Sequence, residues 1–226
     1  MKKFVSLLNW NNCDPKRNGE NLFIVYNAES WGLCVDIGAN LGEYSKYILQ
    51  CNPACRIICF EPNPSLIPAL KADGRFEVHQ CAVGDSLQNI RININARDHA
   101  LTSRYRKNEN TTELDVPQVT LDDFFAQRPS EKISFVKIDA EGSEVSILKG
   151  ARNLIENQRV DMFQFEYGGT FSDAGVKLRD VYALLRGKYI ICHMHMAGIL
   201  PLEYTEELET YLYSNWVAIS RGIFLQ

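Results

Sequence analysis

The stretch VDIGANLG, residues 35–42, combines an acidic side chain with a glycine-rich turn. Asp36 lies two residues before Gly38, and Asn40 stands between Gly38 and Gly42. Glycines at such a turn let the backbone bend sharply and approach a ligand closely. A dinucleotide-binding turn has the form G-x-G-x-x-G, and Asn40 replaces the middle glycine that admits a pyrophosphate. The pattern suits S-adenosylmethionine (AdoMet), which carries no pyrophosphate, although a purely structural tight turn needs the same glycines.

Two further positions fit the same cofactor. Glu61 follows the apolar run CRIICF, residues 55–60, where a carboxylate can accept hydrogen bonds from both hydroxyls of a ribose. Ala82 lies in the short stretch QCAV, residues 80–83, whose backbone groups would meet the edge of an adenine. The alternative explanations are a solvated acid before a proline for Glu61 and an ordinary strand end for Ala82.

Three acidic residues at the predicted ends of two strands are candidates for catalysis. Asp139 and Glu141 follow the apolar run ISFVKI, residues 133–138, and Glu166 follows the predicted strand 162–165. Ligands of open α/β sheets bind outside the carboxyl ends of the strands, so we expect the three acids to converge on one rim. They would take a proton from a hydroxyl group, or they would hold Mg²⁺, which prefers oxygen ligands. The sequence does not decide between proton abstraction and Mg²⁺ binding by these acids.

Two histidines are further candidates. His193 and His195 alternate with Met194 in the stretch ICHMHM, so both imidazoles project from the same face of a predicted strand. A histidine is easily poised to take a proton near neutral pH, and His195, nearer the strand end, is the predicted general base. His193 is predicted to contact the acceptor of the reaction. The alternative for each is a histidine satisfied by a backbone carbonyl.

These residues lie at the junctions of an alternating pattern of strands and helices. Apolar runs predict strands at 32–37, 55–60, 76–81, 116–120, 133–138, 162–165, 189–194 and 216–220. Segments of helical period cover 43–50, 64–71, 121–127, 144–157 and 176–185. This order predicts βαβ units and a mainly parallel sheet, with 89–96 as a half-buried edge strand. We expect a helical cap over residues 1–30 and one domain over residues 1–226.

Composition limits the classes of protein and partner. The chain has 226 residues, of which 46% are hydrophobic and 23% charged, so global disorder is excluded. The net charge of −4 does not show the excess of positive charge that is typical of nucleic-acid-binding proteins. The most apolar stretch, residues 189–202, is too short and too interrupted to span a membrane. Seven cysteines, an odd number with several in predicted strands, indicate reduced thiols and a cytoplasmic protein.

Five blocks of the sequence together resemble the FkbM-type family of AdoMet-dependent methyltransferases. In chain order, the blocks are VDIGANLGEYS from residue 35, EPNP at 61–64, AVGD at 82–85, VTLDDFF at 119–125 and FVKIDAEGSEVSILKGA at 135–151. The resemblance implies a class I methyltransferase fold, a Rossmann-like α/β three-layer sandwich. Its sheet would be mostly parallel and seven-stranded, with an antiparallel last strand. The resemblance also implies O-methylation of a hydroxyl on a sugar, a glycan or a natural product.

Matching positions carry the family's site onto this chain. The implied contacts to the methionine side of AdoMet are Asp36, Gly38, Asn40 and Gly42. Glu61 is the implied ribose ligand, and the block with Asp139 and Glu141 is the implied floor of the reaction site. An NAD-dependent oxidoreductase and a non-catalytic binding module are the alternatives. The acid and asparagine of the first turn argue against the former, and the three acids at the rim argue against the latter.

The polar region 97–112 reads as a long loop without helical or strand period. Loops of this length inside compact domains are usually functional. We expect the loop to close over the acceptor, with Tyr105 giving an apolar face to a sugar. Arg104 and the basic residues near it would then meet a phosphate or a polar glycan. A solvated, charged loop is the alternative.

Overall fold

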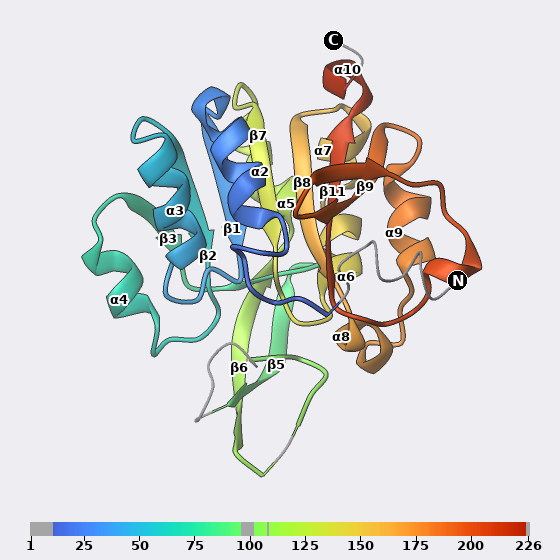
Figure 1. Ribbon diagram of the computed structural model, residues 1–226. Helices are drawn as coiled ribbons and strands as arrows, with labels where there is room; N and C mark the ends of the chain where they lie inside the picture. The colour runs from blue at the N-terminus through green and yellow to red at the C-terminus, as the bar shows by residue number, and fades with distance from the viewer. Residues whose placement is uncertain (1–10, 96–101, 108, 225–226) are drawn as a thin grey trace.

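An eight-stranded sheet forms the centre of the computed structural model, which describes residues 11–95, 102–107 and 109–224 (Figure 1). In spatial order, the strands are β10 (Gly198–Pro201), β9 (Tyr189–His195), β11 (Ser214–Ser220), β8 (Val160–Tyr167), β7 (Ile133–Ile138), β1 (Leu33–Ile37), β2 (Arg56–Phe60) and β3 (Phe76–His79). The strands from β8 to β3 are parallel, and β11 runs antiparallel to β8 and β9. The expected sheet with an antiparallel last strand is confirmed, and β10 adds an edge strand that the sequence did not predict.

Helices pack on both faces of this sheet and give the three layers. One face carries α2 (Glu20–Asn27), η1 (Ala28–Ser30), α3 (Glu43–Cys51) and α4 (Ile67–Ala72). The other carries α5 (Leu121–Ala126), α6 (Glu144–Lys149), α7 (Arg152–Glu156) and α9 (Leu178–Leu185). Successive side chains of a strand point to opposite faces, so Cys34 joins the first core and Val35 the second.

A smaller sheet lies beside the carboxyl ends of the main strands. It contains β4 (Ala82–Val83), β6 (Thr111–Val119) and β5 (Gln88–Asn95) in that order, and β5 and β6 pair antiparallel. Figure 1 shows β5 and β6 extending away from the body of the molecule. The predicted edge strand 89–96 is thus an edge strand of this second sheet. Since β6 begins at Thr111, the end of the predicted loop 97–112 belongs to a strand.

One helix expected from the sequence is interrupted where its backbone passes close to another turn. The predicted helix 144–157 is two helices, α6 and α7, that meet at Gly150. A Cβ added to Gly150 would lie 1.9 Å from the carbonyl oxygen of Gly84, so the chain passes very close to the turn after β4 there. Three short helices complete the description: α8 (Gly169–Asp173), η3 (Glu206–Leu208) and α10 (Arg221–Phe224).

The predicted N-terminal cap and the predicted free thiols can be compared with the structure for the described residues. The predicted cap over 1–30 contains α2 and η1, and its first ten residues lie outside the described part of the chain. All seven cysteines are free thiols; Cys13 is exposed, Cys51 is partly buried and the other five are buried. Within the described residues, no helix has the length and apolar character that crossing a membrane requires.

Candidate active site

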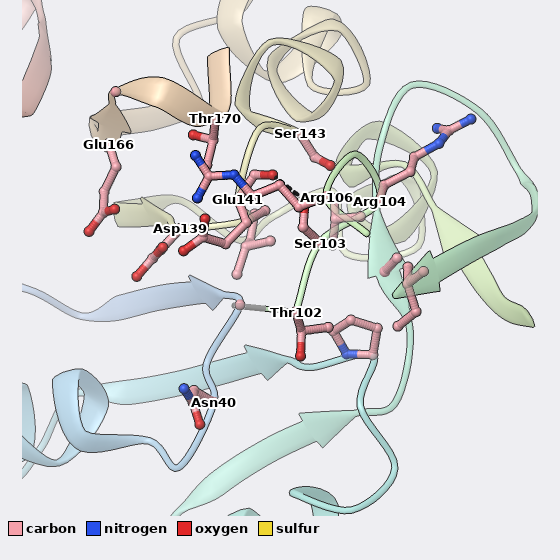
Figure 2. Close-up of a pocket in the computed structure, with 18 of the residues that line it drawn as sticks. Asn40, Thr102, Ser103, Arg104, Arg106, Asp139, Glu141, Ser143, Glu166 and Thr170 are labelled. Atoms are coloured by element: carbon pink, nitrogen blue, oxygen red, sulfur yellow. Dashed lines mark hydrogen bonds between the residues drawn. The ribbon is translucent and has the colours of Figure 1, made fainter. Parts of the chain in front are cut away.

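A cavity of about 700 Å³ opens at the carboxyl ends of β1, β2, β7 and β8 (Figure 2). The predicted residues Gly38, Asn40 and Glu61 line one part of it, where the first two strands end. Asp139 and Glu166 line another part, where β7 and β8 end. The smaller sheet closes one side with apolar side chains of β4 and β5, Ala82 among them: Ala82, Val83, Ile90 and Ile92. The parallel sheet therefore brings both predicted groups, for the cofactor and for catalysis, to one cavity.

The turn after β1 is held tightly against its neighbours. Gly38 has a φ of +77°, and a Cβ added there would lie 1.9 Å from the carbonyl oxygen of Asp139. Asn40 has a φ of +50°, and its backbone N–H donates a hydrogen bond of 2.8 Å to Glu61 Oε2. The backbone N–H of Asn63 donates to Glu61 Oε1, also at 2.8 Å. Both oxygens of one carboxylate thus tie together the turns that follow β1 and β2.

Burial and hydrogen bonding act in opposite directions on Glu61. Only 4% of the residue is exposed, and this burial raises the pKa of its carboxyl above the ordinary value. The two backbone N–H donors lower that pKa by stabilising the charged form. The carboxylate is therefore positioned before any ligand arrives, in the place where the sequence predicted a ribose ligand.

Two predicted cofactor contacts, Asp36 and Gly42, do not line the cavity. Asp36 is buried on the face that α3 covers and accepts a 2.6 Å hydrogen bond from the hydroxyl of Ser45. Gly42 precedes α3 with a φ of +75°, and a Cβ there would lie 2.9 Å from Leu70 and 3.0 Å from Phe76. Both residues thus position α3 behind the turn. Their predicted direct contact with the methionine moiety stays untested.

Lys137 on β7 is a buried cation that the sequence analysis did not single out. Its ammonium lies 2.7 Å from Asp139 Oδ2 and 5.0 Å from the ring centre of Tyr44. Burial lowers the pKa of Lys137, but the carboxylates of Asp139 and Asp36 outweigh it and raise the pKa above its ordinary value. Lys137 therefore stays charged beneath the cavity. The available signal was a lysine within an otherwise apolar strand, next to a predicted catalytic acid.

The carboxylates of Asp139, Glu141 and Glu166 turn toward the same part of the cavity (Figure 2). Burial raises the pKa of Glu166 well above its ordinary value, and the negative charge of Asp139 raises it further. The ammonium of Lys137 and a 2.9 Å hydrogen bond from the hydroxyl of Tyr213 act in the opposite direction. Glu166 is therefore a carboxyl that holds its proton more tightly than a solvated glutamic acid does. The structure thus brings Asp139, Glu141 and Glu166 to one cavity, as expected from the sequence.

The three acids do not form a metal site in the described part of the chain. No group of three His, Cys, Asp or Glu side chains there is placed to hold a metal ion. The ammonium of Lys137 already contacts one carboxylate oxygen of Asp139. The hypothesis that these acids hold Mg²⁺ has no support in this arrangement.

The two candidate histidines do not line the cavity. The cavity lies over β1, β2, β7 and β8, whereas the strand order places β11 between β8 and the histidine strand β9. His193 is buried with its ring centre 5.0 Å from that of Trp216, and burial, with a smaller effect of His195, lowers its pKa to about 4. The backbone carbonyl of His195 packs against Gly19. Their predicted roles as acceptor contact and general base stay untested.

The described part of the predicted loop, residues 102–107, reaches the cavity, and Arg97 lies outside the described residues. Ser103 pairs with Asn93 of β5 and donates a 2.8 Å hydrogen bond from its hydroxyl to the carbonyl of Glu141. Arg104 is exposed and lines the rim, pointing away from the acids in Figure 2. Tyr105 does not line the cavity, because its ring packs against Gly142.

The two other basic residues in the described part of the loop have acidic partners within the chain. Arg106 lines the cavity and is ion-paired with Asp173 at the end of α8. Lys107 lies 2.5 Å from a carboxylate oxygen of Glu113 on β6. These pairs anchor the loop to its neighbours and neutralise charges that the sequence analysis assigned to a phosphate or a glycan.

Four residues that no motif marked also line the cavity. They come from two segments far apart in the sequence: Asn11 and Cys13, and Tyr211 and Tyr213. The spacing of residues within either segment does not predict this wall, because the wall forms only where the two segments meet in the fold. A cluster of tyrosines in the stretch YLYSN was the one available signal.

Comparisons with known proteins agree with this geometry. A model of the FkbM methyltransferase domain matches residues 36–201. Methyltransferase 1 of Beauveria bassiana is 22% identical over an alignment of 157 residues that covers 57% of this chain and 63% of that protein. The 2-O-methyltransferase NoeI of Sinorhizobium fredii is 23% identical over an alignment of 146 residues that covers 55% of this chain and 59% of that protein. The match thus spans less than two thirds of the length of either relative.

A solved structure shares the fold. The plantazolicin methyltransferase BpumL, determined in complex with SAH, aligns with a TM-score of 0.51 over 97% of this chain and 90% of that one. The two sequences are 10% identical, so the likeness concerns the fold alone. The class I methyltransferase architecture expected from the sequence is confirmed.

Proposed function

The chain belongs to the FkbM methyltransferase family, and from this premise we propose that it transfers a methyl group from AdoMet to a hydroxyl of a sugar, glycan or natural product. The observation that carries the proposal is the single cavity that joins the glycine-rich turn and Glu61 to three converging carboxylates. Membership of a methyltransferase family also disfavours the NAD-dependent oxidoreductase that the sequence left as an alternative.

The residues near the first turn fit AdoMet. Asn40 Oδ1 is buried and, among the described residues, accepts no hydrogen bond, so the ammonium of an amino-acid moiety would supply its missing donor. Glu61 presents a carboxylate already held by two N–H groups, and a carboxylate has further lone pairs for ribose hydroxyls. At position 38, the close approach of the Asp139 carbonyl oxygen leaves no space for a side chain. The negative charges around the cavity complement a sulfonium.

Glu166 is our candidate for the general base. When bound, AdoMet supplies a methyl group on a positively charged sulfur. A hydroxyl is a poor nucleophile, so a side chain must take its proton as the new bond forms, a contribution of typically 10²–10⁴-fold. Asp139 is ion-paired with Lys137, whereas burial raises the pKa of Glu166 and makes it the stronger base of the two. Glu166 takes the proton, and Asp139 orients the hydroxyl group.

The charge around the acids favours an uncharged acceptor. Asp139, Glu141 and Glu166 turn toward the same space, and their carboxylates would repel an anionic group placed beside them. Arg106, a basic side chain that lines the cavity, is already ion-paired with Asp173, and Lys137 is ion-paired with Asp139. Neutral hydroxyls, by contrast, donate hydrogen bonds to carboxylates. The name of the Sinorhizobium fredii relative, a 2-O-methyltransferase, also supports an oxygen acceptor.

The test is transfer of labelled methyl from AdoMet to a panel of acceptors. The panel pairs neutral glycosides with the matching uronides and sugar phosphates, and includes an amine acceptor. We expect transfer to hydroxyls of neutral members. AdoMet binding without transfer to any member would favour the non-catalytic binding module, and transfer only to the amine would refute O-methylation.

A separate arm addresses the metal. The wild-type protein is dialysed exhaustively against EDTA and assayed with and without added Mg²⁺. We expect full activity without Mg²⁺, because Glu166 would take the hydroxyl proton and the ammonium of Lys137 already supplies positive charge beside Asp139. Loss of activity that Mg²⁺ restores would return the three acids to the role of metal ligands.

A further inference from the structure

Two short segments form a wall of the cavity next to Glu166, and both lie outside the stretch that the family model matches. The segments are residues 11–13 and 211–213, whereas the match covers residues 36–201. The family match therefore does not cover their lining side chains. Tyr213 contacts Glu166, so this wall lies beside the acids.

The two segments are joined by a pair of hydrogen bonds. The backbone N–H of Asn11 donates to the carbonyl oxygen of Tyr213 at 2.8 Å. In return, the backbone N–H of Tyr213 donates to Asn11 Oδ1 at 3.0 Å. Asn11 adopts a φ of +64°, a conformation that asparagine tolerates better than most residues. The side chain and the backbone of Asn11 thus both fix the position of Tyr213.

The hydroxyl of Tyr213 is directed at the candidate base. It donates a hydrogen bond of 2.9 Å to Glu166 Oε1 and accepts one of 3.3 Å from Asn215 Nδ2. Asn215 lies opposite Glu166 in the register of β11 with β8, and Tyr213 directly precedes β11, so the three residues lie together where these two strands meet the cavity. Because Asn215 donates to the phenol oxygen, the proton of that phenol is left for Glu166.

Tyr213 remains a hydrogen-bond donor over the working range of pH. Burial raises the pKa of its phenol above the ordinary value, and the negative charges of Glu166 and Glu20 raise it further. Lys137, Asp139, Glu20 and Cys13 are the other charged or titratable groups near Glu166. Among the described residues, Tyr213 is the side chain seen to donate a hydrogen bond to Glu166, and it therefore fixes the rotamer of that carboxyl.

We propose that Tyr213, anchored by Asn11, is a positioning residue that holds one oxygen of Glu166 so that the other faces the acceptor hydroxyl. This inference rests on the proposed function, in which Glu166 takes the hydroxyl proton. It assigns to the segments 11–13 and 211–213 a part in acceptor chemistry, and none in cofactor binding.

The test is the variant Tyr213→Phe, which keeps the ring and removes only the hydroxyl. We expect kcat to fall about tenfold through loss of alignment, while the Kd for AdoMet stays unchanged. Activity requires ionised Glu166, and the lost donor had stabilised that ionised form. The acidic limb of the kcat profile should therefore move to higher pH, by about one unit.

The control is Tyr26→Phe, which removes a phenol hydroxyl from a tyrosine that is 78% exposed and outside the cavity. It should match the wild type in kcat and in pH profile. A second variant, Asn11→Ala, removes the anchor of Tyr213 and should lower kcat in the same direction. Thermal melting of every variant reports its folding.

The possible results separate the two proposals. A wild type that transfers methyl to no hydroxyl acceptor overturns the proposed function and this inference together. An active wild type whose Tyr213→Phe variant keeps both its kcat and its acidic limb overturns this inference alone. A fall in kcat that is equal at every pH, with a lowered Tm, assigns Tyr213 a structural role and also overturns it.

Discussion

Replacing Gly38 by alanine tests whether the turn after β1 is built by backbone contact. An added Cβ would lie 1.9 Å from the Asp139 carbonyl oxygen, whereas ordinary contact begins at 3.4 Å, so the two turns must separate by about 1.5 Å. The φ of +77° adds a backbone cost of roughly 1–2 kcal/mol for a residue with a Cβ. Overpacking of this kind costs typically about 1–3 kcal/mol. Gly38→Ala should therefore lower the free energy of unfolding by about 2–5 kcal/mol.

Gly74→Ala is the matched control. Gly74 has a similar φ, +72°, but a Cβ there meets nothing within 4 Å. This variant carries the backbone cost without the collision and should lose only about 1 kcal/mol or slightly more. The difference between the two variants thus isolates the contact between Gly38 and Asp139.

The assays are urea unfolding, for the free energy, and calorimetric titration with AdoMet. Gly38→Ala should also weaken AdoMet binding, because the turn that carries Asn40 must move, whereas Gly74→Ala should bind AdoMet like the wild type. Equal stability of the two variants, together with unchanged AdoMet binding by Gly38→Ala, would refute the argument that close backbone approach shapes the cofactor turn.

Three other predictions concern carboxyl groups. Glu61→Gln should weaken AdoMet binding at least about tenfold in calorimetry, since a neutral amide loses charge-assisted hydrogen bonds; unchanged affinity would remove Glu61 from the ribose site. Glu166→Gln should lower kcat at least about a hundredfold with unchanged AdoMet affinity, and His195→Ala should leave kcat nearly unchanged; the reverse pattern would make His195 the base. Burial raises the pKa of Glu144 to about 8 from an ordinary 4.5, so native stability falls as pH rises through that interval. Melting curves should show that Glu144→Gln removes much of this fall, and an unchanged slope of Tm between pH 5 and 8 would contradict the assignment.

Three of the residues predicted to bind the cofactor line one cavity because they lie close to the ends of strands, and their contact with AdoMet remains a prediction. Gly38, Asn40 and Glu61 each follow a buried run directly, and parallel strands bring such ends to one edge of a sheet. Asp36 belongs to the same motif, yet it lies within the strand rather than after it. Strand alternation directs it to the face under α3, where Ser45 binds it.

The acceptor half was harder to predict because it depends on the order of the strands. His195 does end a strand, as expected, but β11 separates that strand from β8, and a pattern of alternating elements does not reveal this insertion. Tyr213 and Asn11 meet across 202 residues of sequence, so no local spacing connects them. Arg106 was read as free for a ligand, whereas its partner Asp173 lies on a helix whose position only the fold determines.

The insertion of β11 between β8 and β9 affects the order in which parts of the protein fold during synthesis. Both neighbours of β11 precede it in the chain, so a nascent polypeptide ending before Ser214 has two strands without their shared partner. The closing contact between Asn11 and Tyr213 is also one of the most distant in sequence, and such contacts carry a high entropic cost of loop closure. The glycine-rich turn and its carboxylate can therefore assemble early from neighbouring segments. Glu166 acquires its hydrogen bond from Tyr213 only when β11 joins the sheet, so this wall of the cavity forms after the glycine-rich turn.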